Sequence, residues 1–381
     1  MAYGDIGAVI DTYEFDTTGA TNSHIIHIDG DVYAIAYCDA GSQCRLKTVE
    51  IAANGQITDP YIDDLVVHAT RGTAPAIQWV SGNIYAIASR DGSFRPMLST
   101  VEITPAGQIG AAVIDSWAWA TVSETWHAWS KRTATILALA FQGDGHDGWI
   151  YTIQIDVDGN ITKSVDYSLE FDPSGAQPGK MAEVGPGIYA IAHLGPGDDG
   201  IIRTFSQSIT GQLSAAVIDS LIFESVYGWL IWLIQVHPGI YAIPYQGPGN
   251  HGKICTVAVA DDGDIGAAII DSMEFDSTFC GKPNSISCGG DTVAVVYQGP
   301  GNDGWLATLE IDDSGAITDP PLATFEFDPG NGLEPSIIRI TGDVYAIAYT
   351  GVDSDGFLKT VTIESPPEVG PDHSLMMGIG P

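Results

Sequence analysis

Positively charged residues are scarce in this sequence. Its 381 residues include 14 Lys and Arg against 48 Asp and Glu, which gives a net charge of −34 at pH 7. Nucleic acids and anionic membranes bind basic surfaces, so this composition excludes both classes of partner. No apolar stretch approaches the roughly 18 residues of a spanning helix, and we expect no direct membrane insertion in this segment.

Cysteine is rare as well. The five Cys residues, at positions 38, 44, 255, 280 and 288, do not make a disulfide framework in a chain of this size, although the pairs 38/44 and 280/288 could each close a short loop. There is no CxxC pair, which argues against a structural zinc site. The first ten residues, MAYGDIGAVI, do not have the pattern of a signal peptide.

Catalytic motifs are missing too. The sequence contains no HExxH, no GxSxG and no diagnostic Cys–His pair, so it predicts no catalytic residues and no enzyme activity. Paired carboxylates are so abundant that no single pair points to a glycoside hydrolase.

Three loops match GxGxxG, at 195–200, 247–252 and 299–304, but each joins two strand-like segments where a dinucleotide site needs a strand and a helix. We interpret them as hairpin turns. Calcium is the alternative ligand for their Asp and Asn side chains, although the DxDxDG pattern is never complete; the sequence therefore predicts no metal and no other cofactor.

A repeat of 52 residues runs through the whole chain. Stepping back from Tyr345 reaches the second residue of an apolar run each time, and the next residue is always alanine: Ala34, Ala86, Ala138, Ala190, Ala242, Ala294 and Ala346. A threonine follows fourteen residues later: Thr48, Thr100, Thr152, Thr204, Thr256, Thr308 and Thr360. Seven copies with a constant period predict a repeat architecture, and we expect the threonine hydroxyl to bond to neighbouring backbone.

Each repeat contains four strand-like segments. The last copy supplies three, at 335–340, 344–349 and 357–363, and residues 6–15 at the N-terminus supply the fourth. In VYAIAY one face of the strand is small and the other large, which suits sheets stacked side by side. The sequence therefore predicts an all-β fold: a seven-bladed β-propeller with four antiparallel strands per blade, in which the N-terminal strand closes the last blade.

The repeats resemble those of seven-bladed β-propellers. They lack the signatures of WD, kelch and sialidase repeats, and the pattern YAIAYxGxxxDGxLxTVxI is similar to repeats in propeller modules of large prokaryotic surface proteins. We expect residues 1–364 to form a single propeller. The segment 365–381, SPPEVGPDHSLMMGIGP, is expected to be a proline-rich tail or linker. The apolar end of this tail suggests self-association as an alternative to packing on its own propeller.

Two connectors depart from the repeat, at 120–132 and 224–235. Aromatic side chains beside polar ones suit sugar stacking or a protein contact, whereas the structural alternative is that they fill space between irregular blades. The candidate ligand-binding residues are Trp126, His127, Trp129, Lys131, Arg132, Tyr227, Trp229 and Trp232. A further mixed set of residues lines the expected central channel: His27, Trp79, Lys131, Glu183, Gln235, Ser287 and Arg339.

These observations favour a non-enzymatic structural or interaction module, extracellular or on a cell surface. Its expected partner is a protein or a surface glycan. A carbohydrate-binding, lectin-like propeller is the alternative, and a glycoside hydrolase is the third hypothesis.

Overall fold

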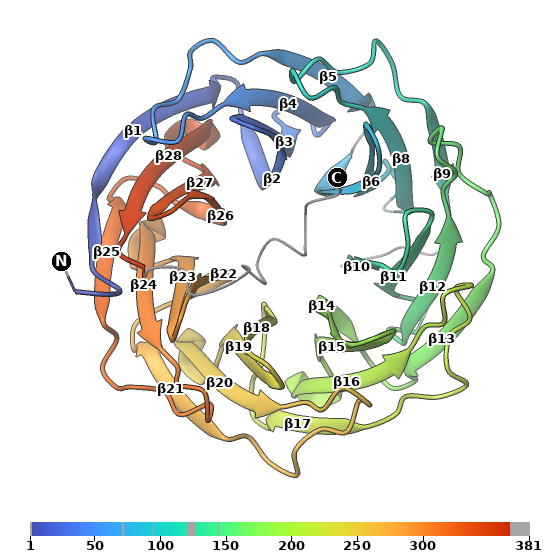
Figure 1. Cartoon of the computed structure of the whole chain (residues 1–381), viewed down its shortest axis with the longest axis vertical. Coiled ribbons are helices and arrows are strands. Elements are labelled where there is room, and N and C mark those ends of the chain that lie inside the picture. The colour runs from blue at the N-terminus through green and yellow to red at the C-terminus, as the bar shows by residue number, and fades with distance from the viewer. Residues whose placement is uncertain (1, 71, 94, 120–126, 144, 366–381) are drawn as a thin grey trace.

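The computed structural model is a ring of seven four-stranded antiparallel sheets around a central channel (Figure 1). It describes residues 2–70, 72–93, 95–119, 127–143 and 145–365. The predicted all-β, seven-bladed propeller is confirmed. The prediction for the tail falls almost entirely on residues 366–381, which lie outside the described residues.

Every blade presents four strands from the channel outwards. The innermost strands are β2 (Ala20–Asp29), β6 (Thr73–Ser81), β10 (His127–Lys131), β14 (Gln177–Gly185), β18 (Ile234–His237), β22 (Gly281–Gly289) and β26 (Leu333–Thr341). The second strands are β3 (Val32–Asp39), β7 (Ile84–Arg90), β11 (Ile136–Gln142), β15 (Ile188–Leu194), β19 (Ile240–Gln246), β23 (Thr292–Gln298) and β27 (Val344–Thr350).

The two outer positions follow the same order. The third strands are β4 (Cys44–Glu50), β8 (Pro96–Glu102), β12 (Gly148–Gln154), β16 (Gly200–Ser206), β20 (Gly252–Ala258), β24 (Gly304–Glu310) and β28 (Gly356–Ile363). The outermost strands are β5 (Asp63–His68), β9 (Asp115–Ala118), β13 (Tyr167–Asp172), β17 (Ser220–Glu224), β21 (Asp271–Asp276), β25 (Ala323–Asp328) and β1 (Ile6–Asp16).

The N-terminal strand closes the ring. β1 pairs antiparallel with β28, so the sheet of the last blade has the order β1-β28-β27-β26. This pairing covers the outer edge of β28, an edge that would otherwise be open to another chain. The predicted closure by residues 6–15 is thus confirmed.

The GxGxxG loops are short turns between second and third strands. Each of the three contains a single 3₁₀ turn, namely η1 (Pro196–Asp198), η2 (Pro248–Asn250) and η3 (Pro300–Asn302), and the last blade has the equivalent η4 (Val352–Ser354). Because each turn joins two strands, no helix N-terminus faces a phosphate site there.

Blades pack by the small and large faces of their second strands. Tyr345, Ile347 and Tyr349 of β27 form one buried cluster with Ala294 and Val296 of the preceding blade. The opposite, alanine face of β27 packs against the large face of β3 in the next blade. All residues from Tyr345 to Tyr349 are fully buried, as expected for a strand covered on both faces.

The recurring threonine joins neighbouring blades. Each buried hydroxyl donates to the carbonyl oxygen of a glycine in the turn of the next blade, at 2.6–2.8 Å, as in Thr48 to Gly107 and Thr360 to Gly55. The interface across the closure uses the same bond, from Thr308 to Gly4 at 2.6 Å. Seven equivalent bonds therefore link all seven blades.

A buried ion pair recurs at the end of the outermost strand. Asp16 accepts from the Tyr37 hydroxyl at 2.6 Å and lies 3.2 Å from the Lys47 ammonium. Asp16 and its equivalent in the third blade, Asp172, are both buried. Their counterparts Glu224 and Asp328 have equivalent cationic partners.

We expect Thr360→Val to destabilise the protein by about 1–3 kcal/mol, because the isosteric change leaves the Gly55 carbonyl buried without its donor. Urea denaturation measures the loss. Thr362→Val, on the same strand but half-buried, is the matched control and should cost less. Equal losses for the two variants would show that the inter-blade bond adds nothing to the free energy of unfolding beyond the effect of removing a threonine hydroxyl from this strand.

We expect stability to fall as the pH drops below about 4. Burial would raise the pKa of Asp16, but hydrogen bonds from Tyr37 and Thr18 and the charge of Lys47 together hold it below its usual value. A lowered native pKa contributes stability above the unfolded pKa of about 3.9, and that stability is lost as pH falls through the native pKa. Urea midpoints between pH 7 and pH 2.5 measure this loss, and Asp16→Asn should flatten the curve. An unchanged curve would contradict the assignment.

Candidate functional site

In several blades the innermost strand carries a bulge near its first residue, and the position of this bulge recurs with the 52-residue period. We call positions 22, 74, 126, 178, 230, 282 and 334 the bulge ring. Pairing with the second strand shifts register across this position in blades such as β2–β3 and β26–β27. Five members have left-handed backbone with φ of 45–54°: Asn22, Ala74, Leu230, Lys282 and Glu334.

The side chains of the bulge ring divide it into two halves. Lys282, Glu334 and Asn22 belong to three consecutive blades and form the polar half. Ala74, Pro178 and Leu230 form the apolar half, while Trp126 lies outside the described residues. The left-handed backbone occurs in both halves, so it belongs to the architecture. The chemistry of this end of the channel is set by which side chain each blade places there.

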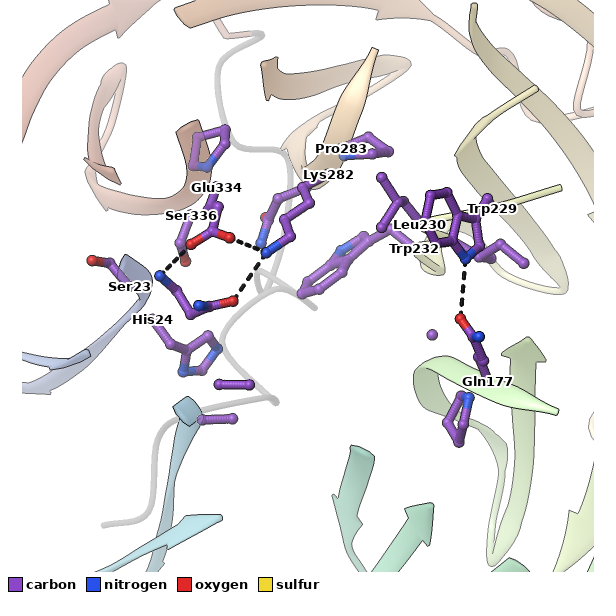
Figure 2. Close-up of a pocket in the computed structure, with 18 of the residues that line it drawn as sticks. Ser23, His24, Gln177, Trp229, Leu230, Trp232, Lys282, Pro283, Glu334 and Ser336 are labelled. Carbon is purple, nitrogen blue, oxygen red and sulfur yellow. Dashed lines mark hydrogen bonds and ion pairs between the residues drawn. The ribbon is translucent and has the colours of Figure 1, made fainter. Parts of the chain in front are cut away.

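The polar half is a connected cluster. The Lys282 ammonium bonds to the Glu334 carboxylate and donates to the Asn22 side-chain oxygen at 3.0 Å. The other Glu334 oxygen accepts from the Asn22 backbone amide at 2.5 Å. Figure 2 shows Lys282 and Glu334 pointing toward one another across the blades. These contacts keep the carboxylate oriented, and both side chains remain partly exposed.

A cavity of about 210 Å³ adjoins this cluster. Its opposite wall is apolar and includes Leu230, Trp229 and Trp232 (Figure 2). The Trp229 indole donates to the Gln177 side chain at 3.0 Å, which fixes the plane of the ring. The cavity therefore sets a charged, hydrogen-bonding side against an aromatic one, the combination that suits a small hydroxylated ligand.

His24 lies two residues after Asn22 and also lines the cavity. Its Nδ1 accepts a hydrogen bond from the Ile77 backbone amide at 3.2 Å. A backbone amide can only donate, so Nδ1 carries no proton, and the proton of this neutral ring is on Nε2. His24 is thereby set as a donor through Nε2.

The channel continues in a larger cavity of about 760 Å³. The two cavities share His24, Trp232, Asn284 and Ser336 in their linings. Of the mixed set predicted to line the channel, the larger cavity includes His27, Trp79, Lys131, Glu183 and Arg339. The Lys131 ammonium lies 3.2 Å from the centre of the Trp79 ring and donates to the Val80 carbonyl, and burial lowers the pKa of Lys131 to about 8.

The candidate residues from the two connectors have different positions. Trp229 and Trp232 line the smaller cavity, and Trp232, Trp129 and Lys131 line the larger one. Tyr227 packs edge-on against Trp229, and Arg132 pairs with Glu183 at 3.4 Å. Trp126 and the side chain of His127 lie outside what the structure describes. A ligand-binding role for these residues stays a prediction.

Sequence reasoning missed Lys282, Glu334, Asn22 and His24. They are isolated polar residues on three innermost strands, β2, β22 and β26, and β2 lies more than 250 positions before the other two, so no short motif contains them. The signal that could have found them is the repeat itself, since stepping by 52 residues from Asn22 aligns N, A, W, P, L, K and E.

The described residues contain no group of three or more His, Cys, Asp or Glu that could hold a metal ion. In the same part of the chain, no helix has the length and apolar character needed to cross a membrane. The five cysteines are buried free thiols, and burial raises the pKa of Cys288 to about 11.

No known protein-family model matches the chain, and no curated protein sequence matches it. Solved structures do resemble it. A periplasmic gluconolactonase of Pseudomonas aeruginosa is 14% identical, with a TM-score of 0.58 over 86% of this chain and 95% of the other. A putative 6-phosphogluconolactonase of Bacteroides fragilis is 12% identical, with a TM-score of 0.60 over 92% and 97%.

A third similar structure, described as BBS1N in complex with ARL6DN, is 12% identical, with a TM-score of 0.56 over 98% of this chain and 99% of the other. Likeness at this identity establishes the fold. The description of that third structure names a complex with another protein, ARL6DN. A specific protein or glycan partner and the extracellular location stay predictions.

The lactonase descriptions overturn the predicted function. We expected a non-enzymatic surface module, with a lectin-like propeller and a glycoside hydrolase as alternatives. This expectation is wrong, because the two similar structures are described as lactonases. The reason is physical: polar groups in a propeller site come from several blades, so the lack of a contiguous catalytic motif does not predict the lack of an enzyme.

We expect Ala74→Gly to stabilise the protein by up to about 1 kcal/mol. The left-handed conformation at φ 50° costs an alanine about 1–2 kcal/mol, which outweighs the greater chain entropy of glycine. Thermal denaturation measures the change. Ala76→Gly, two residues later in β6, is the control and should destabilise. A lower melting temperature for Ala74→Gly would show that the bulge is unstrained.

Proposed function

We propose that the protein is a hydrolase of small hydroxylated cyclic esters, that is, a lactonase. The observation that carries the proposal is the Lys282–Glu334–Asn22 cluster facing an aromatic wall across a cavity of about 210 Å³. The descriptions of two similar structures as lactonases support the reaction class. The polar side of the cavity would bind the ester group, and the indoles would cover the carbon face of the ring.

Glu334 is the general base in this proposal. Its carboxylate is held in place by Lys282 and by the backbone amide of Asn22, each of which contacts a different carboxylate oxygen. An ionised carboxylate can accept the proton of a water molecule as the water oxygen attacks the lactone carbonyl carbon. The proton then moves to Glu334, and a tetrahedral intermediate forms.

Lys282 and His24 would act on the two substrate oxygens. The positive charge of Lys282 stabilises the oxyanion that develops on the carbonyl oxygen. The Nε2–H of His24 donates a hydrogen bond to the ring oxygen as the carbon–oxygen bond breaks, and the proton that Glu334 took from water passes to that oxygen. The net change is the addition of one water molecule, which yields an open-chain hydroxy acid.

We expect Glu334→Gln to lower the enzyme-dependent hydrolysis of D-glucono-1,5-lactone by about 100-fold or more, because an amide cannot act as the base. A pH-stat at pH 6.5, corrected for spontaneous hydrolysis, measures the acid released. Thermal denaturation shows whether the variant is folded.

Glu170→Gln is the matched control, since Glu170 is exposed on the outermost strand β13, away from the channel. It should hydrolyse the lactone at the wild-type rate. The proposal fails if wild-type protein hydrolyses no faster than buffer, or if folded Glu334→Gln keeps the wild-type rate.

A further inference from the structure

One amine in the channel has no role in the proposed hydrolysis. Lys180 is on β14, two residues after Pro178 of the bulge ring, and lines the cavity of about 760 Å³. Its ammonium lies 4.6 Å from the centre of the Trp232 ring. Equivalent positions in the other blades hold His24, Ala76, Ala128, Trp232, Asn284 and Ser336. Lys180 is thus the one lysine at this level of the channel.

Lys180 differs from the other six lysines in its bonding. The ammonium group of each of the others contacts an oxygen acceptor. These lysines are Lys47, Lys131, Lys163, Lys253, Lys282 and Lys359. Among the described residues Lys180 has none. Its contact in this part of the chain is the aromatic face of Trp232, so no oxygen acceptor of the described residues orients its three N–H groups.

The charged groups around Lys180 do not neutralise it. Glu183, the carboxylate on the same strand, contacts Arg132 at 3.4 Å and accepts from the Gly187 amide at 3.0 Å. Lys131, on the neighbouring strand β10, has the same charge as Lys180. His193, on β15 behind it, is buried, and burial lowers the pKa of His193 to about 4, so it is neutral.

The result is an amine that loses its proton easily. Burial lowers the pKa of Lys180 to about 8. A substantial fraction of the side chain is therefore neutral near pH 7.5, and a neutral amine is a nucleophile toward carbonyl carbon. The contact with Trp232 favours the charged form but is weaker than the effect of burial.

We propose that Lys180 is a covalent binding site for the aldehyde or ketone group of a small ligand in the channel. Its lone pair forms the carbon–nitrogen bond while the carbonyl electrons pass to oxygen, and a proton moves from the nitrogen to that oxygen to give a carbinolamine. The hydroxyl of this carbinolamine then takes a proton from solvent and leaves as water, which gives a protonated imine. The site goes beyond the proposed lactone hydrolysis and does not depend on it.

The test is reductive labelling of the wild-type protein with glycolaldehyde and sodium cyanoborohydride at pH 7.0, followed by peptide mass spectrometry. The hydride traps the imine as a secondary amine. We expect Lys180 to be labelled at least ten times faster than Lys163, whose side chain is 52% exposed and paired with Asp115. Lys180→Arg should lose this label while its melting temperature stays near that of the wild type.

Lys131 is the sharper control, because burial lowers its pKa to the same value of about 8 but its ammonium donates to the Val80 carbonyl. It should react more slowly than Lys180. Labelling of Lys180 no faster than that of Lys163 or Lys131 would overturn the proposal. Glu334→Gln should keep the Lys180 label, so failure of the hydrolase proposal and failure of this one are distinguishable.

Discussion

The hydrogen bond between the recurring threonine and the glycine of the next blade is the constraint on which the ring depends. Seven such bonds of 2.6–2.8 Å join the third strand of each blade to the turn that precedes the outermost strand of the next blade. Two of these bonds connect residues from opposite ends of the chain. Each threonine is buried, and a buried glycine carbonyl left without its hydroxyl donor would lower the stability of the fold. Packing of large faces on alanines brings the blades together, and the threonines set their spacing. The spacing in turn fixes the width of the channel and the distance between its side chains.

The sequence was sufficient for the fold because the fold is encoded locally and repeated. Ala346 and Thr360 recur in every copy, and the alternation around Tyr345 shows two buried faces. Even the closure by residues 6–15 could be predicted, since they match the fourth segment of complete copies. The burial of the carboxylates at the ends of the outermost strands was harder to predict. Asp16 looks like a loop residue in sequence, yet Tyr37 and Lys47, from two other strands, bury it.

The candidate site could not be predicted in the same way, because it consists of what differs between copies. Asn22 lies beside Glu334 and Lys282 only through closure of the ring, which places the first blade beside the last. Aromatic residues in the connector 224–235 did draw attention to the right end of the channel, since Trp229 and Trp232 line the cavity. Their chemistry was misjudged because the polar groups opposite them were not visible in any one stretch of sequence.

The central claim is that the polar half of the bulge ring binds the reacting group of the ligand. A crystal structure with a lactam analogue of gluconolactone, which is not readily hydrolysed, tests it most directly. The account predicts the lactam carbonyl oxygen within hydrogen-bonding distance of Lys282, its carbonyl carbon facing Glu334, and its ring against the indole of Trp229 or Trp232. A lactam bound on the outer surface, or in the channel with its carbonyl turned away from Lys282 and Glu334, would contradict it.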